Sequence, residues 1–404
     1  MISIEKAQEV VLANLPACKS ERIGIREAQG RYLAEDLVAA GDIPPFRRAL
    51  MDGYAVRALD VAGAPARLTI VGEVRAGAEI RCRVGPGQAA AVTTGAPVPE
   101  GADAVQIVEQ TERPPDGGAV VVLKPVTPGE NIAAVGSEAV AGETVLEAGR
   151  CIGPAELAVM AMFGYARVSA WKRPSVALLV TGDELVEASD NPGMHQIRNS
   201  NAYSLSGQLR LLGLEPEYLG IVRDCKADLR ARVEDGLERD VLILTGGVSM
   251  GRYDFVKEVL QELQVQILFD KVAMKPGKPT VFARKGDRLL FGLPGNPVST
   301  FVAFENFVRP ALGRLCGSPN PELPRVRGAL QSDMKQSPGR TAFLPARASW
   351  TEAGWMVHPL TWRGSADIIG FSRANAMVMI PGDRAFVNRG EAVEALLLPD
   401  FFHR

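Results

Sequence analysis

Acidic side chains stand directly after two apolar runs in the middle of the chain. Asp183 and Glu184 follow VALLV at 176–180, and Asp254 follows the Gly-rich segment TGGVSMG at 245–251. Neighbouring carboxylates are the ligands that a divalent cation such as Mg²⁺ prefers. Acids are also common in turns and at helix starts, where the helix dipole favours negative charge. Taken singly, each position therefore indicates only a turn or a helix start.

The Gly-rich segment could also bind an anion. Gly246 and Gly247 lack side chains, so backbone N–H groups can approach a phosphate closely, and a helix is expected just after them. The segment matches neither a Walker loop nor the Gly-x-Gly-x-x-Gly fingerprint. An ATPase or a dinucleotide-binding enzyme therefore lacks its signature here, and a sharp turn is the simpler interpretation of this loop alone.

Two later loops carry basic and capping residues. Lys275 and Lys278 flank a Pro-Gly turn in MKPGKPT at 274–280, an arrangement that suits a phosphate clamp. Asn296 lies in GLPGNPVST at 292–300, where it is placed to cap a helix that opens with a proline. The exposed N–H groups of such a helix start would suit another phosphate. Each loop alone also fits an ordinary solvated turn.

All these loops follow strands of one expected sheet. Strands are predicted at 176–180, 218–222, 241–245, 266–269, 279–283 and 288–292, and helices at 201–212, 226–238, 254–263 and 298–314. Continuous apolar strands between amphipathic helices predict a doubly wound α/β domain, with a parallel sheet covered on both faces. Ligands of such sheets bind beyond the carboxyl ends of the strands. The loops therefore converge on one rim, which suits a phosphate-bearing ligand with a divalent cation held by carboxylates.

The rest of the chain is expected to form three further parts. Helical patterns, among them 3–15 with Ser3 as a suitable N-cap and a stretch around 27–34, flank a region of short β-type runs and turns. A Pro-rich linker at 319–324 follows the α/β domain. The expected parts are a discontinuous helical segment, an inserted mostly-β domain, the α/β domain and a C-terminal β barrel, at 1–46 with 142–173, 47–141, 174–318 and 325–404.

Composition excludes several classes of protein. The 45 basic and 47 acidic residues give a formal charge of −2, which argues against broad binding to nucleic acid. Five scattered cysteines without a Cys-x-x-Cys pair argue against a zinc site or a disulfide framework and favour the reducing cytoplasm. No segment is apolar enough to span a bilayer, and the N-terminus does not resemble a secretion signal, so no membrane partner is expected.

Read in order, these motifs resemble those of the molybdenum-insertion family of molybdenum cofactor biosynthesis, the molybdopterin molybdenumtransferases related to the C-terminal domain of gephyrin. The resemblance covers nearly the whole chain and includes motifs outside the α/β domain. The matching segments are MDGYA at 51–55, TTGAPVPEGADAV at 93–105, TGDEL at 181–185, TGGVSMG followed by Asp254, KPGKPT at 275–280, GLPGNPVS at 292–299 and RGS at 363–365.

The resemblance implies an elongated subunit of four parts that works as a homodimer, with an active site drawn from both subunits. The implied substrates are molybdate and adenylylated molybdopterin, which a molybdopterin adenylyltransferase would supply. The implied reaction is a Mg²⁺-dependent cleavage of the pyrophosphate bond that releases AMP and leaves molybdenum on the dithiolene. This chemistry agrees with the absence of a conventional nucleophile, because cleaving a pyrophosphate mainly requires positioning and charge neutralisation.

The resemblance also assigns roles to residues of this sequence. Asp52 and Thr94 look like the part of the active site on the inserted domain. The acids of the pterin side, which would arrange Mg²⁺, water or nucleotide, are Glu184, Asp224 and Asp254. The anion-binding group for molybdate or phosphate is Lys275, Lys278 and Ser365. The backbone phosphate cradles are Gly246, Gly247, Ser249, Pro294, Gly295 and Asn296.

The sequence departs from the family pattern at several places in or beside this site, mostly toward arginine. An arginine of the family is absent from NIAAVGSEA at 131–139, and one lost charged hydrogen bond to an anion costs about 1–3 kcal/mol. The added arginines either compensate, mark an altered specificity, or lie on surface loops without effect. The residues that stand at or near the changed positions are Arg47, Arg48, Val135, Glu138, Arg198, Asn199 and Arg252.

Three functions fit the sequence to different degrees. An active molybdenum insertase, a molybdopterin molybdotransferase, accounts for all the motifs. A protein that binds or carries molybdopterin or the finished cofactor without catalysis accounts for the departures. A nucleotide-processing enzyme on the same pterin-binding fold, similar to the nicotinamide-nucleotide amidase relatives, is disfavoured because the resemblance extends over the inserted domain and the C-terminal barrel.

Overall fold

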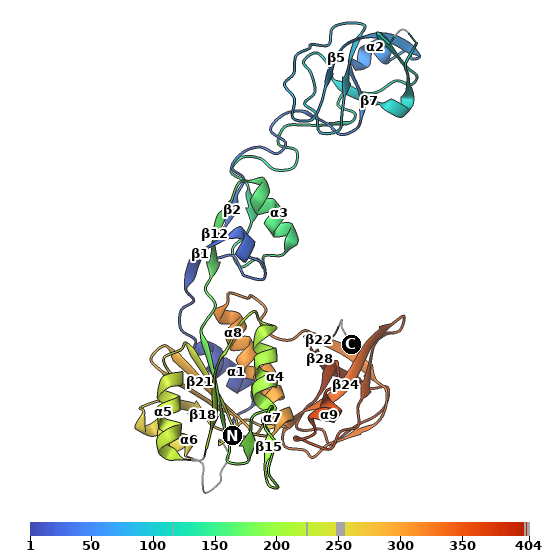
Figure 1. The fold of residues 1–404 in the computed structure, drawn as a ribbon. Helices are drawn as coiled ribbons and strands as arrows, with labels where there is room; N and C mark the ends of the chain where they lie inside the picture. Colours follow the sequence, from blue (N-terminus) through green and yellow to red (C-terminus); the bar gives the residue numbers. More distant parts are fainter. Residues whose placement is uncertain (116, 224, 248–254, 400, 402–404) are drawn as a thin grey trace.

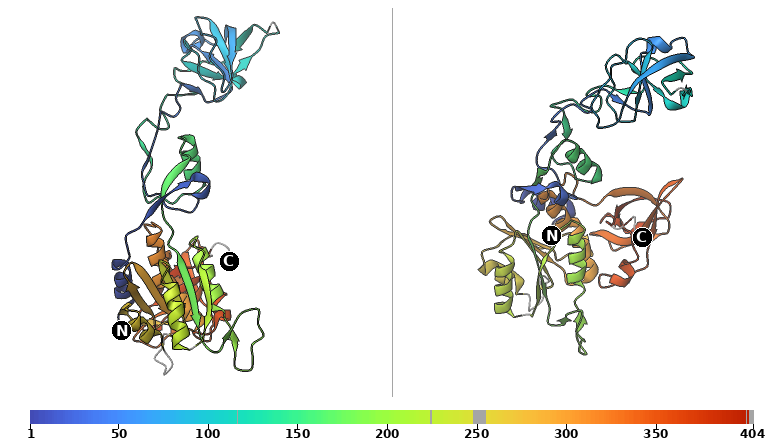
Figure 2. Two further views of the ribbon diagram at one scale, coloured as in Figure 1. Left: turned by 60° about the vertical axis from the view of Figure 1, so that its left-hand side comes forward. Right: turned by 45° about the horizontal axis from the view of Figure 1, so that its top comes forward.

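The computed structural model describes residues 1–404 except 116, 224, 248–254, 400 and 402–404. The molecule is elongated, with an inserted β domain at one end and an α/β domain beside a C-terminal barrel at the other (Figure 1). A narrow arm joins the two ends, and further views show the same separation (Figure 2). Within the described residues no helix is long and apolar enough to cross a membrane.

A six-stranded sheet in the order β16-β13-β17-β21-β20-β18 forms the centre of the α/β domain. The first four strands in this order are parallel, whereas β20 runs antiparallel to both of its neighbours. The prediction of an all-parallel sheet is therefore wrong at this edge, because only two residues join β20 to β21, and so short a connection requires an antiparallel pair. The strands are β13 (Val176–Thr181), β16 (Glu217–Val222), β17 (Val241–Thr245), β18 (Gln266–Phe269), β20 (Val281–Lys285) and β21 (Arg288–Leu293).

Helices cover both faces of this sheet because its central strands are apolar on both sides. Leu178 and Ile243 face one buried cluster, and their neighbours Leu179 and Leu244 face the other. The first cluster contains α1 (Ile4–Ala13), α4 (Asn201–Arg210), α7 (Pro297–Ala303), the π-helical turn η3 (Phe304–Val308) and α8 (Arg309–Leu315). The second contains α5 (Lys226–Gly236) and α6 (Val256–Glu262).

One of the two predicted N-terminal helices is confirmed and the other is wrong. Ser3 caps α1, with its hydroxyl accepting a hydrogen bond from the backbone N–H of Lys6. Residues 27–34 form no helix beyond the short 3₁₀ turn η1 (Ile25–Glu27). The chain turns at Gly30, which has a φ of +73°, and Tyr32 then bridges to Cys151. Pairing with this distant segment replaces the local hydrogen bonds that a helix would need.

The arm consists of two chain passes that pair with each other. β1 (Ser20–Gly24) is antiparallel to β12 (Arg167–Trp171), and β2 (Leu37–Val38) is antiparallel to β11 (Thr144–Leu146). The helix α3 (Pro154–Met162) packs on this ribbon. The arm therefore holds the inserted domain away from the α/β domain (Figure 1).

The inserted domain is a six-stranded sheet in the order β7-β4-β6-β5-β9-β8. Its strands are β4 (Gly53–Val56), β5 (Ala66–Val74), β6 (Gln88–Val92), β7 (Ala104–Ile107), β8 (Thr111–Glu112) and β9 (Ala119–Val122). A further pair, β3 (Arg48–Ala49) with β10 (Ile132–Ala133), and the short helices α2 (Ala58–Val61) and η2 (Val108–Gln110) complete it.

The C-terminal region contains a closed barrel, as the sequence predicts. Strands β24-β25-β22-β28-β26 pair in this order, and the pairing of β24 with β26 closes the ring. These strands are β22 (Arg325–Leu330), β24 (Thr341–Thr351), β25 (Gly354–Pro359), β26 (Ala376–Ile380) and β28 (Ala392–Leu397). Smaller elements are α9 (Ile368–Phe371), the pair β23 (Met334–Lys335) with β27 (Phe386–Val387), and β19 (Met274–Lys275), which pairs with β24.

A buried ion pair lies in the helical layer beneath the sheet. Glu305, in η3, binds the guanidinium of Arg309, and the side chains of both residues are less than one-tenth exposed. Gln208 of α4 donates a 2.7 Å hydrogen bond to the same carboxylate. The contact therefore joins α4 to the η3–α8 helix inside an otherwise apolar layer.

We expect Glu305→Ala to lower the free energy of unfolding of the α/β domain by about 3–5 kcal/mol, because it leaves a buried guanidinium without its carboxylate. Glu9→Ala serves as the control, since Glu9 pairs with Lys6 on the exposed face of α1 and its loss should cost about 0–1 kcal/mol. Denaturant titration followed by circular dichroism measures both changes. Equal losses in the two variants would contradict the role given to Glu305.

Candidate active site

The carboxyl ends of the parallel strands form a rim where loops interlock. Gly246 and Gly247 follow β17 with φ values of +91° and +62°, a conformation that other residues rarely adopt. The backbone there is so close to β13 that a Cβ on Gly246 would lie 2.3 Å from the carbonyl oxygen of Thr181. The backbone of this loop is therefore held at the rim by its contact with the neighbouring strand.

Asn201 at the start of α4 ties two of these loops together. Its side-chain Nδ2 donates to the carbonyl oxygen of Gly295 at 2.8 Å and to the hydroxyl of Thr245 at 3.1 Å. The Thr245 hydroxyl in turn donates to the carbonyl oxygen of Pro294 at 2.9 Å. The loop after β17 and the loop after β21 thus have a fixed relative position.

Buried polar atoms remain without a partner at the same place. The Oδ1 of Asn201 and the hydroxyl of Thr181 have no hydrogen-bond partner within the described residues, although both side chains are less than one-tenth exposed. Sequence reasoning singled out neither residue, nor Thr245. The available signal was a threonine that ends each of two otherwise apolar strands, VALLVT and VLILT.

Ser365 of the C-terminal region reaches the rim. The Nδ2 of Asn296 donates a 2.9 Å hydrogen bond to the Ser365 hydroxyl, and the Val298 N–H donates to the Ser365 carbonyl oxygen at 3.0 Å. Asn296 takes the N-cap position of α7 with Pro297 next, but its side chain makes no capping hydrogen bond. The amide that was expected to cap the helix instead joins it to the RGS segment.

The lysine loop lies at the same edge of the sheet. Residues 270–280 connect the end of β18 to the start of β20, and β18 runs in the same direction as β21. Lys275 is half-buried in β19, whereas Lys278 is exposed. The Thr280 hydroxyl donates to the Gly277 carbonyl oxygen at 2.7 Å, which holds the turn between the two lysines.

Of the three acids expected at the site, the structure describes only Glu184. This residue is exposed in the loop after β13, and its carbonyl oxygen accepts a hydrogen bond from the Ile197 N–H, which pairs β14 (Leu185–Val186) with β15 (Ile197–Arg198). Asp224, Ser249 and Asp254 lie outside the described residues. Among the residues that the structure describes, no group of three or more His, Cys, Asp or Glu side chains could hold a metal ion.

Asp52 and Thr94 meet each other on the inserted domain. The backbone N–H of Thr94 donates to the Asp52 carboxylate at 2.6 Å, and its hydroxyl donates to the same oxygen at 2.9 Å. These two hydrogen bonds hold the pKa of Asp52 below its usual range. Both residues are exposed and lie at the opposite end of the arm from the rim (Figure 1). Within one chain, the two halves of the expected site are therefore far apart.

Two of the added arginines hold the inserted domain together. Arg47 donates to the carbonyl oxygens of Ala102 at 3.1 Å and Pro99 at 3.4 Å. Arg48 pairs with Glu138 at 2.5 Å and so ties β3 to the 131–139 segment. Both guanidinium groups therefore already have partners within the chain.

The changed residues beside the rim also have structural partners. Arg198 donates to the carbonyl oxygens of Ala188 and Asp190, at 3.1 Å each. Asn199 is buried, and its Nδ2 donates to the hydroxyl of Tyr218, which donates to Glu187 at 2.7 Å. Burial and Glu187 both raise the pKa of this tyrosine, so the phenol is neutral at physiological pH.

Three family models match the chain along its length. Residues 2–164 match the MoeA N-terminal region (domain I and II), residues 177–314 match a probable molybdopterin binding domain, and residues 327–398 match the MoeA C-terminal region (domain IV). The N-terminal match covers the inserted domain and most of the arm, and the second match contains the strand-end loops of the rim.

Individual relatives agree with these matches. Molybdopterin molybdenumtransferase of Staphylococcus aureus (strain MSSA476) is 35% identical over 404 residues, which cover 98% of this chain and 95% of the relative. The corresponding protein of Bacillus subtilis (strain 168) is 35% identical over 387 residues, 94% of this chain and 90% of the relative. The crystal structure of the molybdopterin biosynthesis MoeA protein from Pyrococcus horikoshii OT3 superposes with a TM-score of 0.83 at 32% identity, covering 98% of this chain and all of that one.

A structure from Pyrococcus furiosus, a molybdenum cofactor biosynthesis protein, shares the fold at 20% identity with a TM-score of 0.60. The identity to the Staphylococcus aureus and Bacillus subtilis relatives is the stronger evidence for the family, because it extends over the inserted domain, the rim and the barrel together. The chain belongs to the MoeA family of molybdopterin molybdenumtransferases and is an enzyme of molybdenum cofactor biosynthesis.

Proposed function

We propose that this chain transfers molybdenum from molybdate to adenylylated molybdopterin, with Mg²⁺-dependent cleavage of the pyrophosphate bond and release of AMP. The observation that carries the proposal is the convergence of the strand-end loops, the lysine loop and Ser365 on one rim of a MoeA-family chain. Helix starts and lysines both bind phosphate groups. So many anion-binding groups at one rim therefore favour a ligand that carries several phosphates.

The backbone of the rim suits the phosphates of the pterin nucleotide. The Gly246 N–H already donates to the Leu293 carbonyl oxygen at 3.2 Å, so the proposed phosphate donors are the N–H groups of Gly247 on this loop and of the exposed Gly295 on the neighbouring loop. Asn201 and Thr245 fix these loops before any ligand arrives. Donors that are already in place cost no reorganisation when charge develops on a leaving phosphate.

Lys275, Lys278 and Ser365 are proposed to hold the oxyanions. The two lysines lie on a turn held by Thr280, and Ser365 is anchored through Asn296 at the start of α7. A lysine is a point charge, so it suits a tetrahedral molybdate or phosphate of variable orientation. This group brings positive charge from the α/β domain and a hydroxyl from the C-terminal region to the same rim.

The acids fit Mg²⁺ by their chemistry. Glu184 presents an exposed carboxylate at the rim, and Asp224 and Asp254 are the further proposed ligands, since carboxylate oxygens are the donors that Mg²⁺ prefers. When bound, the ion would neutralise charge on the pyrophosphate as it is cleaved. In this arrangement Glu184 would hold the ion near the loop of Gly246 and Gly247.

Asp52 and Thr94 are proposed to reach the rim of a second copy of the chain. They form one rigid hydrogen-bonded pair, and the arm keeps this pair away from the rim of its own chain. A symmetric homodimer allows each inserted domain to complete the site of the partner, because a two-fold interface repeats every contact twice. The ionised Asp52 could then orient water or molybdate beside the lysines.

Three of the arginines at the changed positions have structural partners. Arg48 is paired with Glu138, and Arg47 and Arg198 donate to carbonyl oxygens that fix where their guanidinium groups lie. Arg252 lies outside the described residues. The change that favours the second candidate, a protein that binds the pterin without turnover, is Ala133, because this small residue stands where the family pattern Asn-Ile-Arg has its arginine.

We expect purified protein to release AMP from adenylylated molybdopterin when Mg²⁺ and molybdate are both present. Supplying the nucleotide directly removes the need for a molybdopterin adenylyltransferase, and omission of either molybdate or Mg²⁺ is the control. Chromatography of the nucleotide products measures the reaction. Tight binding of the substrate with no AMP at any oxyanion concentration would favour the non-catalytic carrier and overturn the proposal.

We expect Asp52→Ala to abolish turnover while leaving pterin binding largely intact, and Lys275→Ala with Lys278→Ala to abolish turnover through the rim. Mixed and reassociated, the two inactive proteins should recover about a quarter of wild-type activity, since half of the dimers are mixed and each holds one intact site. The AMP assay on the mixture, with each variant alone as control, tests this. No recovery in confirmed mixed dimers would show that both halves of the site belong to one chain.

A further inference from the structure

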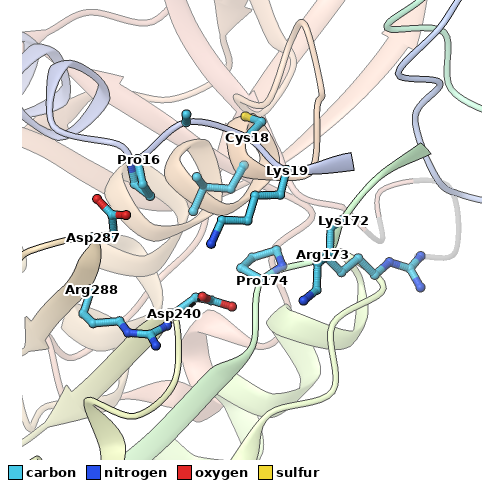
Figure 3. A pocket seen from close by; sticks show the side chains of 11 residues that line it. Pro16, Cys18, Lys19, Lys172, Arg173, Pro174, Asp240, Asp287 and Arg288 are labelled. Atoms are coloured by element: carbon cyan, nitrogen blue, oxygen red, sulfur yellow. Dashed lines mark hydrogen bonds and ion pairs between the residues drawn. The ribbon is translucent and has the colours of Figure 1, made fainter. Parts of the chain in front are cut away.

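Two cavities lie where the arm enters the α/β domain, far from the rim. The first, of about 270 Å³, is lined by the basic residues Lys19, Lys172, Arg173 and Arg288 and by the acidic residues Asp240 and Asp287 (Figure 3). Asp240 accepts a 2.8 Å hydrogen bond from Arg288, so this arginine already has a partner.

The second cavity, which we call the elbow cavity, is the larger of the two. It has a volume of about 540 Å³ and is lined by Tyr32 and Cys151 of the arm, by Arg173, by the end of α4 at 210–213, and by the linker at 318–324. All three parts of the molecule that meet here contribute to its wall. A volume of this size is typical of sites for small organic ligands.

Arg173 is the unusual residue of this wall. It lines both cavities, and its side chain extends away from Asp240 (Figure 3). Its Nη2 lies against two glycine turns, because a Cβ on Gly213 would come within 2.3 Å of it and one on Gly30 within 3.8 Å. Within the part of the chain that the structure describes, no hydrogen-bond acceptor or carboxylate contacts its guanidinium, whereas the lining residues Arg210 and Arg309 pair with Glu215 and Glu305.

Arginines outnumber acids around Arg173, since the elbow cavity is lined by Arg173, Arg210 and Arg309 and by the acid Glu322. The neighbouring Arg31 is 8% exposed, donates to Glu21 and to the Trp171 carbonyl oxygen, and keeps a buried Nε without a partner within the described residues. Burial, followed by the charge of Arg31, lowers the pKa of Arg173. Burial raises the pKa of the nearby Cys316 to about 11, so this thiol is neutral at physiological pH and supplies no counter-charge.

We propose that the elbow cavity binds a small organic anion, with a carboxylate or phosphate group on Arg173 and an apolar body against Leu212, Pro321 and Leu323. A guanidinium presents a fixed fork of N–H donors that fits either group in a bidentate manner. The apolar lining residues favour a ligand with a hydrophobic portion over a bare inorganic ion. Such a ligand contacts the arm, the α/β domain and the linker at once.

The test uses the full chain carrying Lys275→Ala and Lys278→Ala, so that the rim contributes no anion site and the result does not depend on the proposed function. Cys151 lines the cavity and is exposed, and the exposed Cys225 at the start of α5 is an internal reference. We expect phenyl phosphate or benzoate, but not benzyl alcohol, to slow alkylation of Cys151 by iodoacetamide and to leave Cys225 unchanged. Comparing the two anions identifies the preferred head group.

Arg173→Gln should weaken this protection by at least about tenfold in ligand concentration, because it removes a charge-assisted contact. Arg173→Lys should retain part of it, and Arg22→Gln, which alters an arm arginine paired with Glu35, should match the parent. Circular dichroism confirms that each variant is folded. Equal protection in Arg173→Gln, protection by benzyl alcohol, or no protection by either anion overturns the proposal.

Discussion

The hydrogen bonds of Asn201 are the constraint on which the candidate site depends. Strands β13 and β17 are buried along their whole length, so they can place chemistry only where they end. Their terminal residues Thr181 and Thr245 bring polar atoms into this apolar layer, and Asn201 satisfies Thr245 while it holds Gly295. Together with the hydrogen bond from Thr245 to Pro294, this amide fixes the relative position of the two loops.

The arm imposes a second constraint, because it separates groups that the proposed reaction would bring together. Asp52 is held by Thr94 at one end of the molecule, and the lysine loop lies at the other. The arm is a paired ribbon and not a flexible linker, so folding back within one chain would break the pairing of β1 with β12. Association of two chains is the arrangement that joins the halves at least structural cost.

Sequence patterns predicted the strands and most helices because these depend on local apolar periodicity, as in β17 and α5. They failed at 27–34, where Tyr32 pairs with Cys151 more than a hundred positions away, and at β20, where a short turn reverses the strand. The motifs predicted that Gly246 and Asn296 lie in loops at the ends of strands, which the structure confirms. The contact of Asn296 with Ser365 and the role of Asn201 could not be anticipated, because both depend on tertiary packing between distant segments.

The surroundings of the arginines are a further property that depends on tertiary packing. The formal charge of −2 averages over arginines with very different surroundings. Arg47, Arg48 and Arg198, which the sequence marks as departures near the site, are bound to carbonyl oxygens or to Glu138. Arg173, which no motif distinguishes, is half-buried between two glycine turns beside another arginine. An arginine binds a ligand through the N–H donors that the fold leaves unused, so its surroundings decide its role as much as its position in a motif does.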